Sequence, residues 1–161
     1  MKSMVHPCLV GVLLLSGFGC MAPNYVFDGP PGPAPAASVA ICEGSLRRLF
    51  TPSSPSAGQV GAPQIVILSC DLDETNRAIL AEKVNDLPLD LRFASSQNDV
   101  YSAPRTLSIK IGIKWIDNHH AYVSIWRQEF PSGQGSGTHA DAKYESGQWR
   151  LYDSHLMSTI N

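Results

Sequence analysis

Histidine and aspartate side chains that could carry acid–base or metal chemistry gather in the C-terminal half of the chain. A histidine beside a carboxylate can transfer protons, and three or four converging ligands would hold zinc. The chain has no H-E-x-x-H spacing, and surface or turn positions account for such histidines more simply. We therefore expect no metal site. The side chains considered are His119, His120, His139, His155, Asp117, Asp141 and Asp153.

An acid–base function stays open as an alternative. A two-residue turn at Ser146-Gly147 would place Thr138 opposite His155 and would point His139 to the other face of the sheet. A slip of one residue would reverse this arrangement. The alternative is therefore a small hydrolase or isomerase in which His139, Asp141 or His155 serves as acid or base in a sheet pocket.

Other catalytic motifs are missing from the sequence. There is no G-x-S-x-G nucleophile elbow. The glycine-rich stretch 133–137 joins two expected strands and precedes no helix that could present N–H groups to a phosphate, so we expect a flexible hairpin loop. Helix capping accounts for the acidic stretch 71–74. We assign no catalytic residue and expect no cofactor.

The first twenty residues have the layout of a secretory signal. Lys2 supplies a short positive region, an apolar run covers 9–15, and small residues follow. The apolar run is too short to span a bilayer, which needs about 20 residues. Export is therefore expected, with 1–19 as the signal peptide.

The stretch Leu-Ser-Gly-Phe-Gly-Cys at 15–20 resembles the lipobox of bacterial lipoproteins. It departs from that pattern at Gly17, where leucine is usual, and at the bulky Phe18. The resemblance implies that Cys20 receives a diacylglycerol and palmitate and becomes the first residue of a lipid-anchored envelope protein. Met21 stands where an aspartate would retain the protein in the inner membrane, so we expect the outer membrane, facing the periplasm. The alternative is a plain secreted protein.

A proline-rich tether is expected at 20–38. Its prolines favour extended polyproline geometry, which makes a semi-rigid spacer of about 3 Å per residue. The short apolar island at 25–27 could dock back on the domain.

Two cysteines remain after cleavage removes Cys8 and lipidation consumes Cys20. In an oxidising compartment, Cys42 and Cys70 should form a disulfide. That bridge would stabilise the domain by roughly 3 kcal/mol on the chain-entropy model. We expect a structural bridge rather than a redox site, because no C-x-x-C spacing is present.

The remaining residues, 39–161, are expected to form one α+β domain. Helical spacing predicts a short helix at 40–50, and a β-branched apolar run predicts a buried strand at 64–70. Asp73 is expected to cap a second helix. Alternation then predicts a strand at 89–94.

The strongest pattern is period-two alternation at 107–115, which predicts an amphipathic strand. Further strands are expected at 121–125, 137–145 and 148–157, joined as an antiparallel meander. We therefore predict one or two helices packed on a four- or five-stranded, mostly antiparallel sheet.

The segments 121–126, 137–144 and 147–151 resemble the last hairpins of cystatin-like and steroid-isomerase-like α+β rolls. They are also similar to C-terminal segments of uncharacterised exported bacterial proteins. The resemblance implies a curved sheet that can serve as a pocket. No catalytic motif of the roll enzymes matches, so no residue role is carried over.

Aromatic residues mark the candidate binding surface. Tyr122 and Trp126 lie on the strand face opposite Val123 and Ile125, and Phe130 extends the row. One interpretation is a two-sided core, with a helix or the N-terminal segment covering this second face. The other is a surface for a partner or ligand, because exposed apolar patches mark contact sites.

The net charge of −2 and the lack of a basic stripe exclude a nucleic-acid partner. The expected function is that of a membrane-anchored envelope lipoprotein with a non-enzymatic interaction or ligand-binding domain. Its expected partners are the membrane, through the lipid anchor, and an envelope protein or a small ligand.

Overall fold

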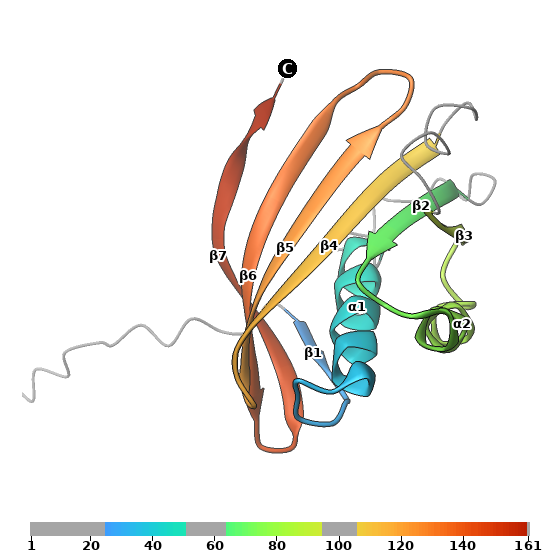
Figure 1. Cartoon of the computed structure of the whole chain (residues 1–161). Coiled ribbons are helices and arrows are strands. Elements are labelled where there is room, and N and C mark those ends of the chain that lie inside the picture. The colour runs from blue at the N-terminus through green and yellow to red at the C-terminus, as the bar shows by residue number, and fades with distance from the viewer. Residues whose placement is uncertain (1–24, 51–63, 95–105, 161) are drawn as a thin grey trace, which may run out of the picture.

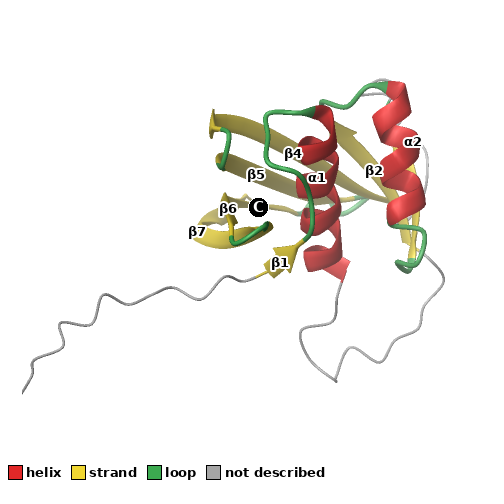
Figure 2. Ribbon diagram, turned by 90° about the horizontal axis from the view of Figure 1, so that it is seen from below, coloured by secondary structure: helices red, strands yellow, loops and turns green. Residues whose placement is uncertain are grey.

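In the part of the chain that the structure describes, seven strands form one curled sheet, and two helices cover one of its faces (Figures 1 and 2). The structure is a computed structural model that describes residues 25–50, 64–94 and 106–160, with side chains up to Asp153. The expected signal peptide and Cys20 lie outside these residues. The elements are β1 (Tyr25–Phe27), α1 (Pro35–Phe50), β2 (Gln64–Cys70), α2 (Glu74–Lys83), β3 (Leu89–Phe93), β4 (Thr106–Asp117), β5 (His120–Glu129), β6 (Gly135–Glu145) and β7 (Gln148–Ile160).

The predicted α+β class with a four- or five-stranded, mostly antiparallel sheet is wrong. The strand order is β1-β7-β6-β5-β4-β2-β3, and the fold is a mostly-β half-barrel with a mixed sheet. The meander of β4 to β7 is antiparallel, but β2 pairs in parallel with both β3 and β4. A parallel neighbour requires a long crossover connection, here supplied between β2 and β3 by α2.

One strand of the sheet, β1, lies in a segment that was expected to be a spacer and for which no strand was predicted. Residues 25–27 form β1, which pairs antiparallel with β7 so that Tyr25 lies opposite Leu151. Three residues are too few to show an alternating pattern, so only the apolar character of the island was visible in the sequence. The following segment leads into α1, which begins at Pro35.

The core lies between α1 and the helix-facing side of the sheet. Leu107, Ile109 and Ile111 of β4 are at most 3% exposed, as the period-two pattern predicts. Leu46 and Ile41 of α1 are fully buried against this layer. The burial of this contiguous apolar layer is the main force that holds the helix in the curl of the sheet.

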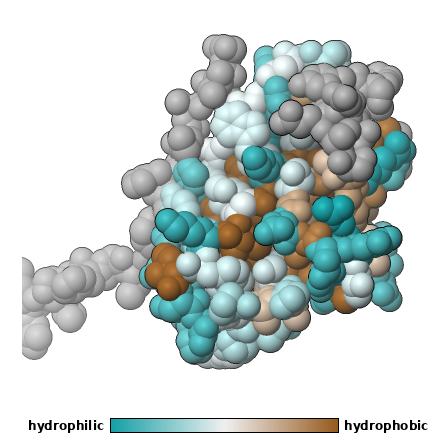
Figure 3. Space-filling model, viewed as in Figure 1, coloured by the Kyte–Doolittle hydropathy of each residue, from teal (hydrophilic) through white to brown (hydrophobic). Residues whose placement is uncertain are grey.

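Exposed large apolar side chains are scattered among the described residues. Val26, Ile79 and Ile116 are 41%, 41% and 56% exposed and lie on three different elements. On the side of the molecule shown in Figure 3, apolar residues likewise reach the surface in patches among polar ones. Neither helix of the described residues is long and apolar enough to cross a membrane.

The N-terminus of α2 is capped as predicted. The carboxylate of Asp73 accepts a hydrogen bond from the backbone N–H of Asn76 at 2.8 Å. This bond lowers the pKa of Asp73, because it stabilises the charged form. The cap satisfies one of the backbone donors that a helix start leaves unpaired.

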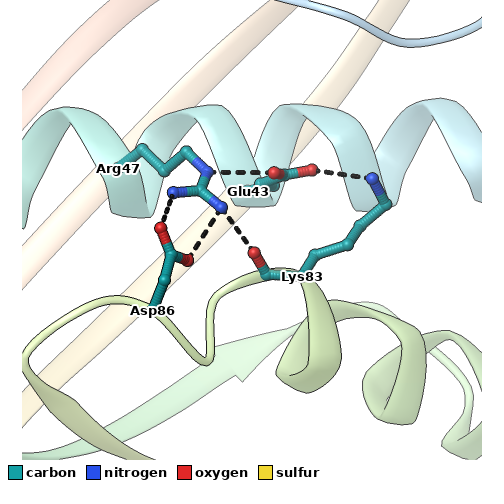
Figure 4. Close-up of polar contacts among 4 residues, drawn as sticks. All are labelled: Glu43, Arg47, Lys83 and Asp86. Atoms are coloured by element: carbon teal, nitrogen blue, oxygen red, sulfur yellow. Dashed lines mark hydrogen bonds and ion pairs between the residues drawn. The ribbon is translucent and has the colours of Figure 1, made fainter.

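An ion-pair network ties α1 to the end of α2 (Figure 4). Both terminal nitrogens of Arg47 bind Asp86, at 2.9 and 3.0 Å, and its Nε donates to Glu43 at 3.0 Å. Glu43 also pairs with Lys83 at 3.1 Å. The contact with Arg47 lowers the pKa of Asp86, so its stabilising effect is present above the ordinary pKa of aspartate and is lost as the pH falls through the lowered value.

We expect Gly44→Ala to destabilise the domain even though alanine favours helices by about 1 kcal/mol over glycine. A Cβ at position 44 of α1 would lie 2.5 to 2.8 Å from ring atoms of Phe27 in β1. Overpacking of this kind costs about 1–3 kcal/mol, so urea denaturation should show a net loss. Phe27→Ala in the same chain should remove the penalty of the alanine. A stabilising Gly44→Ala would contradict this packing.

Candidate binding face of the sheet

Both helices lie on the same side of the sheet, so neither covers the other face (Figure 2). On β5, the half-buried Tyr122, Ser124 and Trp126 alternate with buried Ala121 and Val123. The half-buried side chains therefore point to the face without helices. This geometry places two of the three aromatic residues singled out in the sequence on one surface.

Trp126 rests on two glycines of the neighbouring strand. A Cβ at Gly137 would lie 2.6 Å from Cε3 of the indole, and one at Gly135 would lie 3.3 Å from its Cζ2. The six-membered ring of the indole thus spans both glycines, and a side chain at Gly137 would displace it. The expected flexible loop at 133–137 is wrong in its second half, since Gly135 begins β6.

His139 belongs to the same surface, which the sequence did not predict. Its ring stacks on that of Tyr122, with centroids 5.2 Å apart and planes 24° apart. The sequence left the register of the β6–β7 hairpin open between two alternatives, and the structure has the one in which the backbone of His139, rather than that of Thr138, pairs with His155. A bulge next to Ala140 shifts the register there, and a turn-based count of residues cannot see it.

We call Tyr122, Trp126 and His139 the aromatic face. Phe130, the third predicted member, follows the end of β5, and its backbone N–H donates to the carbonyl of Thr106 at 2.9 Å. It therefore lies at the end of the row rather than within the strand.

Charged and polar groups flank the aromatic face. Lys114 lies opposite Tyr122 and Lys110 opposite Trp126 on β4, and both lysines are exposed. Toward β6, Nε2 of His120 lies 2.9 Å from Oδ1 of Asp141, which is paired with Tyr122. These groups offer hydrogen-bond donors and acceptors around the rings, with an excess of positive charge along β4.

The His120–Asp141 pair is the closest arrangement to the acid–base alternative. The side chains are 29% and 32% exposed. Among the described residues, a cavity of about 230 Å³ lies at Arg127 and Glu129 and a smaller one lies at the cysteines, and this pair lines neither of the two. His139 stacks on Tyr122 instead, and Asp153 forms an ion pair with Arg48 of α1. Within the described residues, no three potential ligands converge as a metal site.

The cysteines expected to form a bridge lie together but are unjoined. Cys42 is buried in α1, and Cys70 is half-buried at the end of β2. The disulfide stays a prediction.

Comparison of the chain with protein-family models, with curated proteins and with solved structures finds no match.

Proposed function

We propose that this chain is a membrane-anchored envelope lipoprotein whose domain binds a ligand through the aromatic face, without catalysis. The lipobox-like segment ending at Cys20 supports the anchor, and Met21, where an aspartate would favour the inner membrane, supports a position at the outer membrane facing the periplasm. The observation that carries the binding role is a sheet face that neither helix covers, on which Trp126 is seated over two glycines. A ring supported in this way is positioned for contact before a ligand arrives.

The ligand that best fits this face is a glycan of the cell wall. Ser124 separates Tyr122 from Trp126, so the apolar area consists of ring faces within a polar surround. A sugar ring offers a flat C–H face that packs on an aromatic ring, and its hydroxyl groups can bond to His120 and Asp141. Lys110 and Lys114 would attract carboxylated saccharides.

Trp126→Ala tests this proposal in a co-sedimentation assay with purified cell-wall sacculi. An aromatic contact is worth about 0.5–1.5 kcal/mol, so we expect affinity to fall about two- to tenfold. Trp126→Phe, which keeps a ring over the glycines, should lose less. Circular dichroism will show whether each variant keeps its fold.

Ile79→Ala is the matched control. Ile79 is 41% exposed on α2, on the helical side of the sheet, so its loss should leave both folding and sedimentation unchanged. Equal loss of binding in Ile79→Ala and Trp126→Ala would contradict the proposed face. If the wild-type chain does not bind sacculi but cross-links to an envelope protein from position 126, the proposal of a glycan ligand is wrong and the partner is a protein.

A further inference from the structure

A small cavity opens between α1 and the end of β2, away from the aromatic face. Its volume is about 110 Å³. Cys42 and Ser38 of α1 line it together with Cys70 and Asp71, and three apolar side chains of β4 form another part of its wall. The cavity thus brings together two thiols from elements far apart in the sequence.

The two thiols are unequal in burial and in acidity. Cys42 is 1% exposed, whereas Cys70 is half-buried. A hydrogen bond between them raises the pKa of Cys42, which is further raised by burial, and lowers the pKa of Cys70. The charge of Arg77 lowers the pKa of Cys70 further. Cys70 is therefore the thiol that ionises, and Cys42 stays protonated as its donor.

We propose that Cys42 and Cys70 form a thiol–disulfide exchange site that reacts with small disulfides, with Cys70 as the attacking and Cys42 as the resolving cysteine. The motivation is geometric: both thiols line one cavity, and only Cys70 is partly open to solvent. This proposal goes beyond ligand binding by the aromatic face. It also differs from a permanent bridge, because the folded domain would hold both the dithiol and the disulfide.

The exchange proceeds in two balanced steps. The thiolate of Cys70 attacks one sulfur of the small disulfide, forms a mixed disulfide and releases one small thiolate. Cys42 then loses its proton, and its sulfur attacks the sulfur of Cys70, which releases the second small thiolate. The two cysteines are oxidised to a disulfide, the small disulfide is reduced to two thiols, and the two protons leave with the products.

The test exposes the purified full chain, first reduced under native conditions, to glutathione disulfide. Samples are quenched with acid and alkylated, and peptide mapping then separates Cys42 and Cys70 from the cysteines of the N-terminus. We expect the wild type to form the Cys42–Cys70 bridge and reduced glutathione to reverse it. Cys42→Ser should accumulate glutathione on Cys70. Cys70→Ser should react at Cys42 at least tenfold more slowly.

A second measurement does not depend on the folding of either variant. Limiting iodoacetamide, applied to the reduced wild-type chain, should label Cys70 at least tenfold faster than Cys42. Equal labelling of the two thiols would overturn the proposed roles. A bridge that yields to glutathione only after the chain is unfolded would show a permanent staple and would overturn the exchange, as would a folded dithiol that never reacts. None of these results depends on whether the aromatic face binds a glycan.

Discussion

Trp149→Ala is expected to destabilise the domain by about 3–5 kcal/mol, a large part of the 5–15 kcal/mol that holds a typical domain together. Trp149 of β7 is fully buried. Its ring meets Trp115 edge-on at 5.7 Å and Tyr144 at 5.4 Å. Its Nε1 also donates to the carbonyl of Pro30 at 2.8 Å. The truncation therefore leaves a cavity where β7, β4 and the segment before α1 meet.

Urea denaturation of the purified chain measures this loss. Trp149→Phe keeps a ring in the core but removes the hydrogen bond to Pro30, so it should cost less than Trp149→Ala, about 1–3 kcal/mol. Ile79→Ala again serves as a surface control and should change stability by less than about 0.5 kcal/mol. A loss below about 1 kcal/mol for Trp149→Ala would contradict the full burial of this side chain in the core.

Cys20→Ala is expected to release the chain from the membrane. In the proposed lipoprotein this cysteine carries the acyl chains, and each buried CH₂ contributes about 0.8 kcal/mol to membrane attachment, so several chains make it nearly permanent. Fractionation of host cells should find the wild type with the membranes and the variant in the soluble fraction or still carrying its signal. Intact mass should show acyl groups on the wild type alone.

Cys8→Ala is the matched control for the anchor. Cys8 lies within the expected signal peptide, so this variant should be cleaved, acylated and retained on the membrane like the wild type. Acylation of a chain without Cys20, or a mature wild type that carries no lipid, would contradict the anchor. The plain secreted protein would then be the better interpretation of the signal.

Local patterns in the sequence predicted the elements whose cause is local. The cap at Asp73 needs only neighbouring backbone donors, and it was found where the sequence predicts it. Alternation along β4 reports directly which side chains face the helical side of the sheet: Leu107, Ile109 and Ile111 are buried there, and the two later positions of the pattern are half-buried. These features can be predicted from the sequence without knowing which strands pair with each other.

The features that failed depend on partners far along the chain. β1 forms a strand because it pairs with the edge of the sheet at β7, and the residues Tyr25–Phe27 alone do not indicate this pairing. The parallel pairing of β2 follows from the crossover through α2 rather than from the residues of the strand itself. The sequence could therefore predict most strands but not the number in the sheet or their mixed directions.

The candidate site divides in the same way. Alternation on β5 predicted that Tyr122 and Trp126 share a face. The contribution of His139 depends on the register between β5 and β6, where it lies opposite Ser124. The seat for Trp126 depends on Gly137 lying directly across from it. The glycine-rich run at 133–137 was the only signal of this contact in the sequence. That its glycines make room for the indole of Trp126 depends on the pairing of β6 with β5.

The most direct test of the binding face is a nuclear magnetic resonance titration of the isotope-labelled chain with soluble cell-wall fragments. The three tryptophans supply internal reporters: Trp126 lies on the aromatic face, Trp115 lines the cysteine cavity, and Trp149 is fully buried. Binding should shift the indole N–H signal of Trp126 and leave that of Trp149 in place. Saturable shifts centred on Trp115 or Trp149, or no shift at any of the three, would contradict a glycan-binding aromatic face.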